Sequence, residues 1–171
     1  MTAPLTLRPL QADDVPVIAA AFAALGWNKP AAQYERYLQE QEAGSRVVIV
    51  ALWDGAFAGY LTICWESDYA PFAEENVPEI RDFNVLPQMR RQGIGTALMD
   101  DAERRIAERG PVAGIGVGMT ADYGAAQRMY VRRGYVPDGR GLTTAGPRWV
   151  TYGETVPVDD DLVLFFTKRL R

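Results

Sequence analysis

A basic turn punctuated by glycines joins a strand-like run to a helix-like run near the middle of the chain. It spans residues 90–95 with the sequence RRQGIG, and it lies between the runs 80–86 and 94–108. The first N–H groups of a helix lack partners within the helix, and they point toward an anion together with the positive end of the helix dipole. Gly93 and Gly95 let the backbone approach a ligand closely, and two arginines supply charged donors for phosphate oxygens. The turn therefore predicts a phosphate-binding site at the start of a helix.

Two common phosphate motifs do not fit this turn. The dinucleotide motif G-x-G-x-x-G needs a third glycine where the chain has Leu98, which disfavours a Rossmann-type nucleotide binder. The chain also contains no G-x-x-x-x-G-K-[ST] sequence. The remaining pattern, Arg/Gln-x-x-Gly-x-Gly after a strand, is by itself equally compatible with an ordinary tight strand-to-helix turn.

A second motif follows about one βα unit later. Residues 126–135 have the pattern of a helix that ends at Gly134 in a left-handed cap and turns into a strand. The turn resembles the pyrophosphate loop of the GCN5-related N-acetyltransferases (GNAT), which bind acetyl-coenzyme A (acetyl-CoA). The helix resembles the second motif of that family, Asn-x-x-Ala-x-x-Leu-Tyr-x-x-x-Gly-Phe. The matching positions are Tyr123, Ala126, Met129, Tyr130, Gly134 and Tyr135, with tyrosine at 123 where asparagine is usual.

This resemblance implies a fold, an activity and a cosubstrate. The fold is mixed α/β, with a mostly antiparallel central sheet flanked by helices and with strands four and five splayed apart, in a single domain over residues 1–171. The activity is transfer of an acetyl group from acetyl-CoA to a primary amine of a small molecule or peptide, by direct attack in a ternary complex. The alternative is a non-catalytic acyl-CoA-binding or sensing module of the same fold. Members of the family commonly form homodimers.

The resemblance also assigns two catalytic candidates. Tyr130 matches the tyrosine that the family places near the cofactor sulfur, where it would act as an acid for the leaving thiolate. Glu79 begins the fourth strand, where some members of the family carry a glutamate base. Alternation along an extended strand places Glu79 on one face and Asp82 on the other. Glu66, Asp68 and solvent stay open as alternative bases.

The predicted cofactor contacts lie on the fourth strand and on the turn. The backbone of the strand is expected to pair with the pantetheine arm and to stabilise the oxyanion. The N–H groups of the turn are expected to bind the pyrophosphate. The predicted cofactor-binding residues are Phe83, Asn84, Val85, Arg90, Arg91, Gln92, Gly93, Ile94, Gly95 and Thr96.

The charge of the chain limits its partners. Its 171 residues carry a formal net charge of −4, which argues against nucleic-acid binding. Coenzyme A is an anion, so its attraction must come from a local cluster of cations. The excess of acid elsewhere suits a cationic, amine-bearing acceptor. The candidate cations are Arg90, Arg91, Arg128, Arg132 and Arg133.

The chain contains one cysteine, Cys64, and no histidine. An internal disulfide is therefore excluded, and Cys64 is expected to be a small buried hydrophobe because it lies in an apolar run. The lack of histidine excludes Ser-His-Asp and Cys-His catalysis, and no metal cofactor is expected. No segment has the character of a signal sequence or a membrane span, so the expectation is a cytoplasmic protein that does not bind membranes.

Periodicity and breaker residues predict the order of the elements. Strands are predicted at 5–8, 47–53, 56–65, 79–86, 112–119 and 161–167, with a further strand beginning at residue 135. Helices are predicted from residue 13 or 14 to 24, at 30–42, at 94–108 and in the second motif. Asp54-Gly55 is expected to form a two-residue hairpin turn. The segments 66–78 and 139–160 are predicted to be irregular loops.

Overall fold

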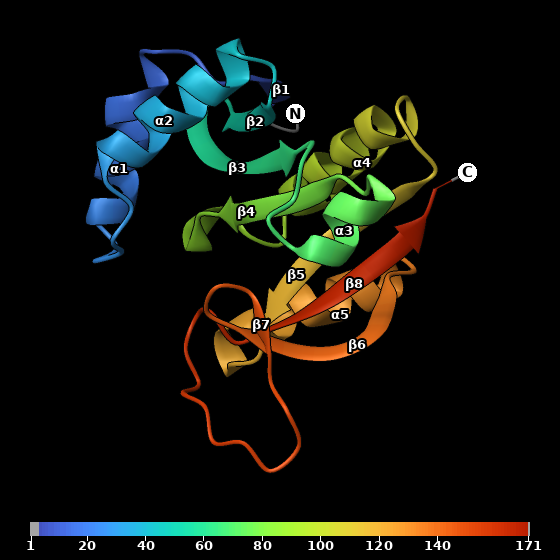
Figure 1. Cartoon of the computed structure of the whole chain (residues 1–171). Coiled ribbons are helices and arrows are strands. Elements are labelled where there is room, and N and C mark those ends of the chain that lie inside the picture. The colour runs from blue at the N-terminus through green and yellow to red at the C-terminus, as the bar shows by residue number, and fades with distance from the viewer. Residues whose placement is uncertain (1–3, 171) are drawn as a thin grey trace. The chain divides into compact units, whose positions relative to one another are not determined.

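The computed structural model describes residues 4–170 (Figure 1). Its strands form an eight-stranded sheet in the order β1-β2-β3-β4-β5-β8-β6-β7. β4 and β5 pair in parallel, whereas β1–β2, β2–β3, β5–β8, β6–β7 and β6–β8 are antiparallel. This confirms the predicted mixed, mostly antiparallel sheet flanked by helices.

In chain order the elements are β1 (Leu5–Pro9), α1 (Asp14–Ala23), α2 (Ala31–Glu42), β2 (Arg46–Trp53), β3 (Ala56–Cys64), α3 (Ala70–Glu75), β4 (Glu79–Val85), the 3₁₀ helix η1 (Pro87–Met89), α4 (Ile94–Ala107), β5 (Val112–Gly118), the 3₁₀ helix η2 (Ala121–Tyr123), α5 (Gly124–Arg132), β6 (Val136–Thr144), β7 (Arg148–Trp149) and β8 (Val163–Arg169).

The described chain divides into two compact units that are interleaved in sequence. The first unit contains residues 4–64 and 81–104, and the second contains residues 65–80 and 105–170. β4 and α4 each contribute residues to both units. The parallel β4–β5 ladder joins Glu79 to Gly114 and Ile80 to Ile115, so it lies within the second unit. A single domain over residues 1–171 stays a prediction.

The first unit contains the antiparallel strands β1, β2 and β3 together with α1 and α2. β1 pairs with β2, and β2 pairs with β3 from Arg46↔Cys64 to Trp53↔Ala56. The turn between β2 and β3 places Asp54 at φ 50° and Gly55 at φ 77°, as expected for a two-residue hairpin. Cys64 is buried, as predicted. The core of this unit contains Leu10, Val15, Ile18, Phe22, Tyr34, Tyr37, Val48, Val50, Phe57, Tyr60 and Leu86.

The second unit packs aromatic side chains against a glycine-lined face of β5. A Cβ atom at Gly114 would lie 2.3 Å from the ring of Phe72, and one at Gly118 would lie 2.5 Å from the ring of Tyr123. Side chains two residues apart in a strand share a face, so these glycines leave room for the aromatic rings from α3 and η2. The Tyr69 ring stacks on Phe165 of β8, with 3.7 Å between the ring centroids.

Two elements lie where irregular loops were predicted, and those predictions were wrong. α3 lies within the segment 66–78, and its six residues are too short to give a helical period. The segment 139–160 contains the end of β6 and the two-residue β7. The β6–β8 register shifts between Pro137 and Leu142, where Gly139 and Gly141 have positive φ. Such a shift breaks the two-residue alternation by which a strand is recognised.

Candidate active site

The predicted phosphate turn leads into α4 with a left-handed backbone. Gly93 has φ 82° and Arg91 has φ 62°. A Cβ atom at Gly93 would meet no described atom within 4 Å, so this glycine is required by the backbone conformation rather than by crowding in the protein. The Gly93 carbonyl accepts the Ala97 N–H at 3.0 Å, which closes the first turn of α4. The N–H groups that precede Ala97 in this turn are those that a helix leaves for a ligand.

The side chains of the turn are exposed except at its apolar anchor. Ile94 is 1% exposed and fixes the start of α4 in the core. Arg90, Arg91, Gln92 and Thr96 are exposed. Arg90 Nε donates to the Val85 carbonyl at 3.1 Å, which ties the turn to the end of β4. The chemistry of the turn therefore fits an anion, because two guanidinium groups and the first amide groups of a helix lie at an exposed turn.

The end of β4 lies unusually close to β3. A Cβ atom at Gly59 would lie 2.5 Å from the Asn84 carbonyl oxygen and 3.0 Å from Val85 Cα. Gly59 thus permits a close approach of two backbones at the segment that is predicted to bind pantetheine. Phe83, Asn84 and Val85 each remain partly exposed.

Asp82 is the centre of a buried polar network that the sequence did not reveal. Its φ of 49° interrupts the extended conformation of β4, and the placement of Asp82 and Glu79 on opposite faces stays a prediction. Both carboxylate oxygens accept hydrogen bonds. The donors are Lys29 Nζ at 2.6 Å and Asn84 Nδ2 at 2.8 Å to Oδ1, and Gln33 Nε2 at 2.8 Å, Tyr37 OH at 2.9 Å and Tyr60 OH to Oδ2.

The electrostatics of this network keep Asp82 charged. Burial works to raise the pKa of Asp82, but Lys29 and the hydroxyls of Tyr60 and Tyr37 hold it below its usual value. Burial and the Asp82 charge both raise the pKa of Tyr60, so that phenol remains a donor. A carboxylate in this state is a poor proton acceptor, and we assign Asp82 no role as the base.

In the second unit, Glu79 is buried beside a hydroxyl group. It is 6% exposed, and it accepts a hydrogen bond from Ser67 Oγ. The same Ser67 oxygen accepts the Tyr69 N–H at 3.0 Å. The two alternative bases, Glu66 and Asp68, are exposed. Of the three carboxylates that the sequence offered, Glu79 therefore has the environment that most restricts its access to water.

Tyr130 is also buried in the second unit. It is 5% exposed, and its ring lies 6.0 Å from that of Tyr135. Burial raises the pKa of Tyr130, and the nearby Tyr123 adds to this effect, so the hydroxyl stays protonated at neutral pH. Gly134 follows α5 with φ 92°, and the Tyr135 N–H donates to the Tyr130 carbonyl at 3.0 Å. This confirms the predicted left-handed helix end.

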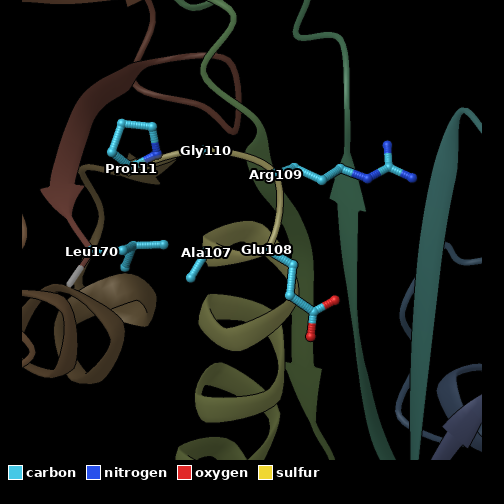
Figure 2. A pocket seen from close by; sticks show the side chains of 6 residues that line it. All are labelled: Ala107, Glu108, Arg109, Gly110, Pro111 and Leu170. Carbon is cyan, nitrogen blue, oxygen red and sulfur yellow. The ribbon is translucent and has the colours of Figure 1, made fainter.

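A separate hollow lies at the C-terminal end of α4, away from these residues in the sequence (Figure 2). Its volume is about 390 Å³. Beside it, the Arg109 guanidinium lies 3.8 Å from the centroid of the Trp65 ring. No predicted site residue lines this hollow, so it carries no part of the candidate site. The lining residues are Ala107, Glu108, Arg109, Gly110, Pro111 and Leu170.

Metal-binding clusters and membrane-spanning helices are both absent from residues 4–170. In that range, no three or more His, Cys, Asp or Glu side chains are grouped in a way that could hold a metal ion. None of the helices in the same range has both the length and the apolar character needed to cross a membrane.

The chain is similar to known acetyltransferases in sequence and in fold. An uncharacterized N-acetyltransferase of Archaeoglobus fulgidus is 38% identical over 84 residues, a match that covers 48% of this chain and 55% of that protein. The chain thus spans about half the length of the curated relative it matches. The fold resembles an N-acetyltransferase from Staphylococcus aureus Mu50, with a TM-score of 0.72, 14% identity and coverage of 99% and 100% of the two chains. It also resembles yncA from Salmonella typhimurium, solved with its cofactor acetyl-CoA, with a TM-score of 0.68, 17% identity and coverage of 98% and 94%.

A sequence model of the acetyltransferase (GNAT) family matches residues 15–135, which is more than half of the chain. The matched range contains the turn before α4, the whole of α5 and the glycine that ends it. The chain therefore belongs to the GNAT acetyltransferase family.

Proposed function

We propose that the chain is an acetyl-CoA-dependent N-acetyltransferase that acetylates a primary amine by direct attack in a ternary complex. Membership of the family supports acetyl transfer, and the similar fold of yncA with acetyl-CoA supports the cosubstrate. The single observation that carries the proposal is the turn before α4, with its left-handed backbone and exposed guanidinium groups. Residues 91–96 would bind the pyrophosphate through N–H groups, and the backbone of Phe83, Asn84 and Val85 would pair with pantetheine.

The acceptor amine must lose a proton before it can attack. The pKa of an alkylammonium, about 10.4, lies about 3.4 units above neutral pH, so forming the free amine at that pH costs about 4.6 kcal/mol. We assign the removal of this proton to Glu79, which would accept it directly or through water. Its burial and its hydrogen bond from Ser67 support the assignment, because burial disfavours the charged form of a carboxyl group and so favours its taking up a proton.

The leaving thiolate needs a donor, and we assign that role to Tyr130. Its raised pKa keeps the hydroxyl protonated, which makes it a hydrogen-bond donor throughout the reaction. A thiol has a pKa of about 8.5, so full transfer from a phenol of higher pKa is uphill. Tyr130 therefore stabilises the sulfur chiefly by donating a hydrogen bond as charge develops on it.

Binding of coenzyme A by the turn is tested first. Isothermal titration calorimetry on the wild type is expected to detect saturable binding, and Arg90→Ala and Arg91→Ala are each expected to weaken it by about tenfold. Arg104→Ala is the matched control, because Arg104 lies further along α4 and pairs with Asp101. The absence of any heat with coenzyme A would remove the proposal.

Turnover separates the enzyme from a sensing module. Thiol release from acetyl-CoA is measured with a panel of primary amines in wild type and in Tyr130→Phe. The variant is expected to lose about 100-fold in kcat with acetyl-CoA affinity retained. An equal loss of kcat and of acetyl-CoA affinity would contradict the assignment of Tyr130 as the hydrogen-bond donor to the leaving sulfur. Saturable binding without thiol release for any amine would favour the non-catalytic acyl-CoA-binding module.

A further inference from the structure

The ammonium group of Lys29 lies in surroundings of the kind that bind a free alkylammonium ion. Its Nζ atom is 2.6 Å from Asp82 Oδ1 and 3.3 Å from the Tyr60 hydroxyl. It also lies 5.7 Å from the ring centroid of Phe22 and 5.9 Å from that of Tyr60. A carboxylate combined with aromatic rings provides both ion pairing and cation–π attraction. All four residues belong to the first unit.

Lys29 is held differently from the tyrosines that share Asp82 with it. Tyr37 and Tyr60 come from α2 and β3, and they are 6% and 0% exposed. Lys29 comes from the connection between α1 and α2. The Lys29 and Asp82 side chains remain 19% and 17% exposed, so water reaches this ion pair. The hydroxyl donors therefore come from the buried core, whereas the lysine comes from a connection between helices and is partly exposed to water.

We propose that Asp82, Tyr60 and Phe22 form a binding site for a primary alkylammonium group, that Lys29 occupies it in this structure, and that a cationic acceptor binds there by displacing Lys29. The part that concerns the acceptor rests on the proposed function. The site itself follows from the contacts of Lys29 alone.

The charge of the site defines the class of acceptor. An ammonium paired with a carboxylate is stabilised in its protonated form, and a protonated amine cannot attack the thioester. The group bound at Asp82 is therefore not the nucleophile but a second cation of the same molecule. The expected acceptors are diamines, or peptides that carry a basic group in addition to the reacting amine.

The site is tested without catalysis by replacing the atoms that Lys29→Ala removes. The variant lacks Cγ, Cδ, Cε and Nζ, which is the skeleton of n-propylammonium. We expect Lys29→Ala to melt below wild type, and about 50 mM n-propylammonium chloride to raise its Tm by about 3 °C. Propan-1-ol lacks the charge and tetramethylammonium chloride lacks the N–H donors, so neither is expected to restore the Tm.

Two variants serve as controls for this rescue. Lys29→Met fills the path of the lysine stem and is expected to gain nothing from n-propylammonium. Lys168→Ala removes the other lysine of the chain, whose ammonium lies 5.7 Å from the Tyr135 ring centroid, and is also expected to gain nothing. Equal gains in Lys29→Ala and either control, or no gain in Lys29→Ala, would overturn the site. If Lys29→Ala is insoluble, its refolding yield is measured instead. A higher yield with n-propylammonium than with propan-1-ol would support the site, and equal yields would overturn it.

The acceptor class is tested by kinetics on the wild type. We expect kcat/KM for 1,4-diaminobutane to exceed that for n-butylamine by at least about tenfold. Lys29→Ala is expected to lower KM for the diamine without changing KM for acetyl-CoA, and Asp82→Asn is expected to abolish the preference. Equal kcat/KM values for the two amines in wild type would overturn displacement by the acceptor. If no amine is acetylated, the proposed function fails, and the Tm measurement still decides the ammonium site.

Discussion

β4 carries two carboxylates three residues apart, and their surroundings differ. Asp82, in the first unit, accepts hydrogen bonds from a lysine, two tyrosines and two amide groups. Glu79, in the second unit, accepts a hydrogen bond from the Ser67 hydroxyl and is buried beside it. Both are largely buried, so burial alone does not distinguish an anchor from a base. Asp82 is distinguished by the lysine among its donors, because the Lys29 cation holds that carboxylate in its ionised form.

The largest effect is expected from removing the anchor. Asp82→Ala would leave the Lys29 ammonium without its carboxylate and several donors without an acceptor, which costs about 3–5 kcal/mol of unfolding free energy. Urea denaturation of wild type and variant measures this loss. Asp82→Asn keeps one acceptor oxygen and should lose less. The double variant Lys29→Met with Asp82→Asn should be more stable than the sum of the losses of its two single variants implies, because a pair replaced together leaves no buried charge.

An unchanged stability in Asp82→Ala would contradict the view that Asp82 anchors the first unit. A double variant that is as unstable as the sum of the two single variants would contradict the coupling of Lys29 to Asp82.

For the second carboxylate, Glu79, we expect a small loss of stability and a large loss of turnover. Glu79→Gln keeps an acceptor for Ser67, so we expect a loss of about 1 kcal/mol in stability. Turnover should fall by about 100-fold, which is about 2.7 kcal/mol in the activation free energy. The pH–rate profile of kcat/KM should lose its lower limb. Glu66→Gln and Asp68→Asn are the matched controls, and a normal profile in Glu79→Gln would move the base elsewhere or to solvent.

The two carboxylates also show what the sequence could and could not predict. The turn before α4 and the second motif are local patterns, and the structure forms the helix starts and ends that they predict. The Asp82 network is not local, because its partners Lys29 and Tyr37 lie 53 and 45 residues away in sequence. It also depends on the left-handed φ of Asp82, for which the only sequence signal is an aspartate inside a strand.

Glycines that permit close contacts were equally hard to predict. Gly59 and Gly114 weaken a strand pattern, but the sequence does not say which atoms occupy the space that they leave. In the first unit that space holds the Asn84 carbonyl, and in the second it holds the Phe72 ring.

A smaller effect, of about 1–3 kcal/mol in stability, is expected from a methyl group at either glycine. Gly59→Ala presses on backbone at the predicted pantetheine segment, so it should also raise KM for acetyl-CoA several-fold. Gly114→Ala presses on a side chain, so Phe72→Leu in the same chain should recover stability. Gly110→Ala, whose Cβ would meet no described atom within 4 Å, is the control. An unchanged KM in Gly59→Ala would argue against pantetheine binding at residues 83–85.

The smallest effect is the response of the first unit to acid. The pKa of Asp82 is below its usual value because Lys29 and the tyrosine hydroxyls outweigh the effect of burial. The unfolded chain, with an Asp pKa of about 3.9, then binds more protons than the folded chain at low pH. The stability that Asp82 contributes is therefore complete above about pH 4 and is lost as the pH falls through the lower folded value.

Urea denaturation at pH 5, 4 and 3 should show wild type losing up to about 1.4 kcal/mol per pH unit more than Asp82→Asn. Glu74→Gln, which removes an exposed carboxylate, should follow wild type. Parallel slopes for wild type and Asp82→Asn would show that Lys29 does not hold Asp82 in its charged form, and the distinction between the two carboxylates of β4 would then lose its electrostatic basis.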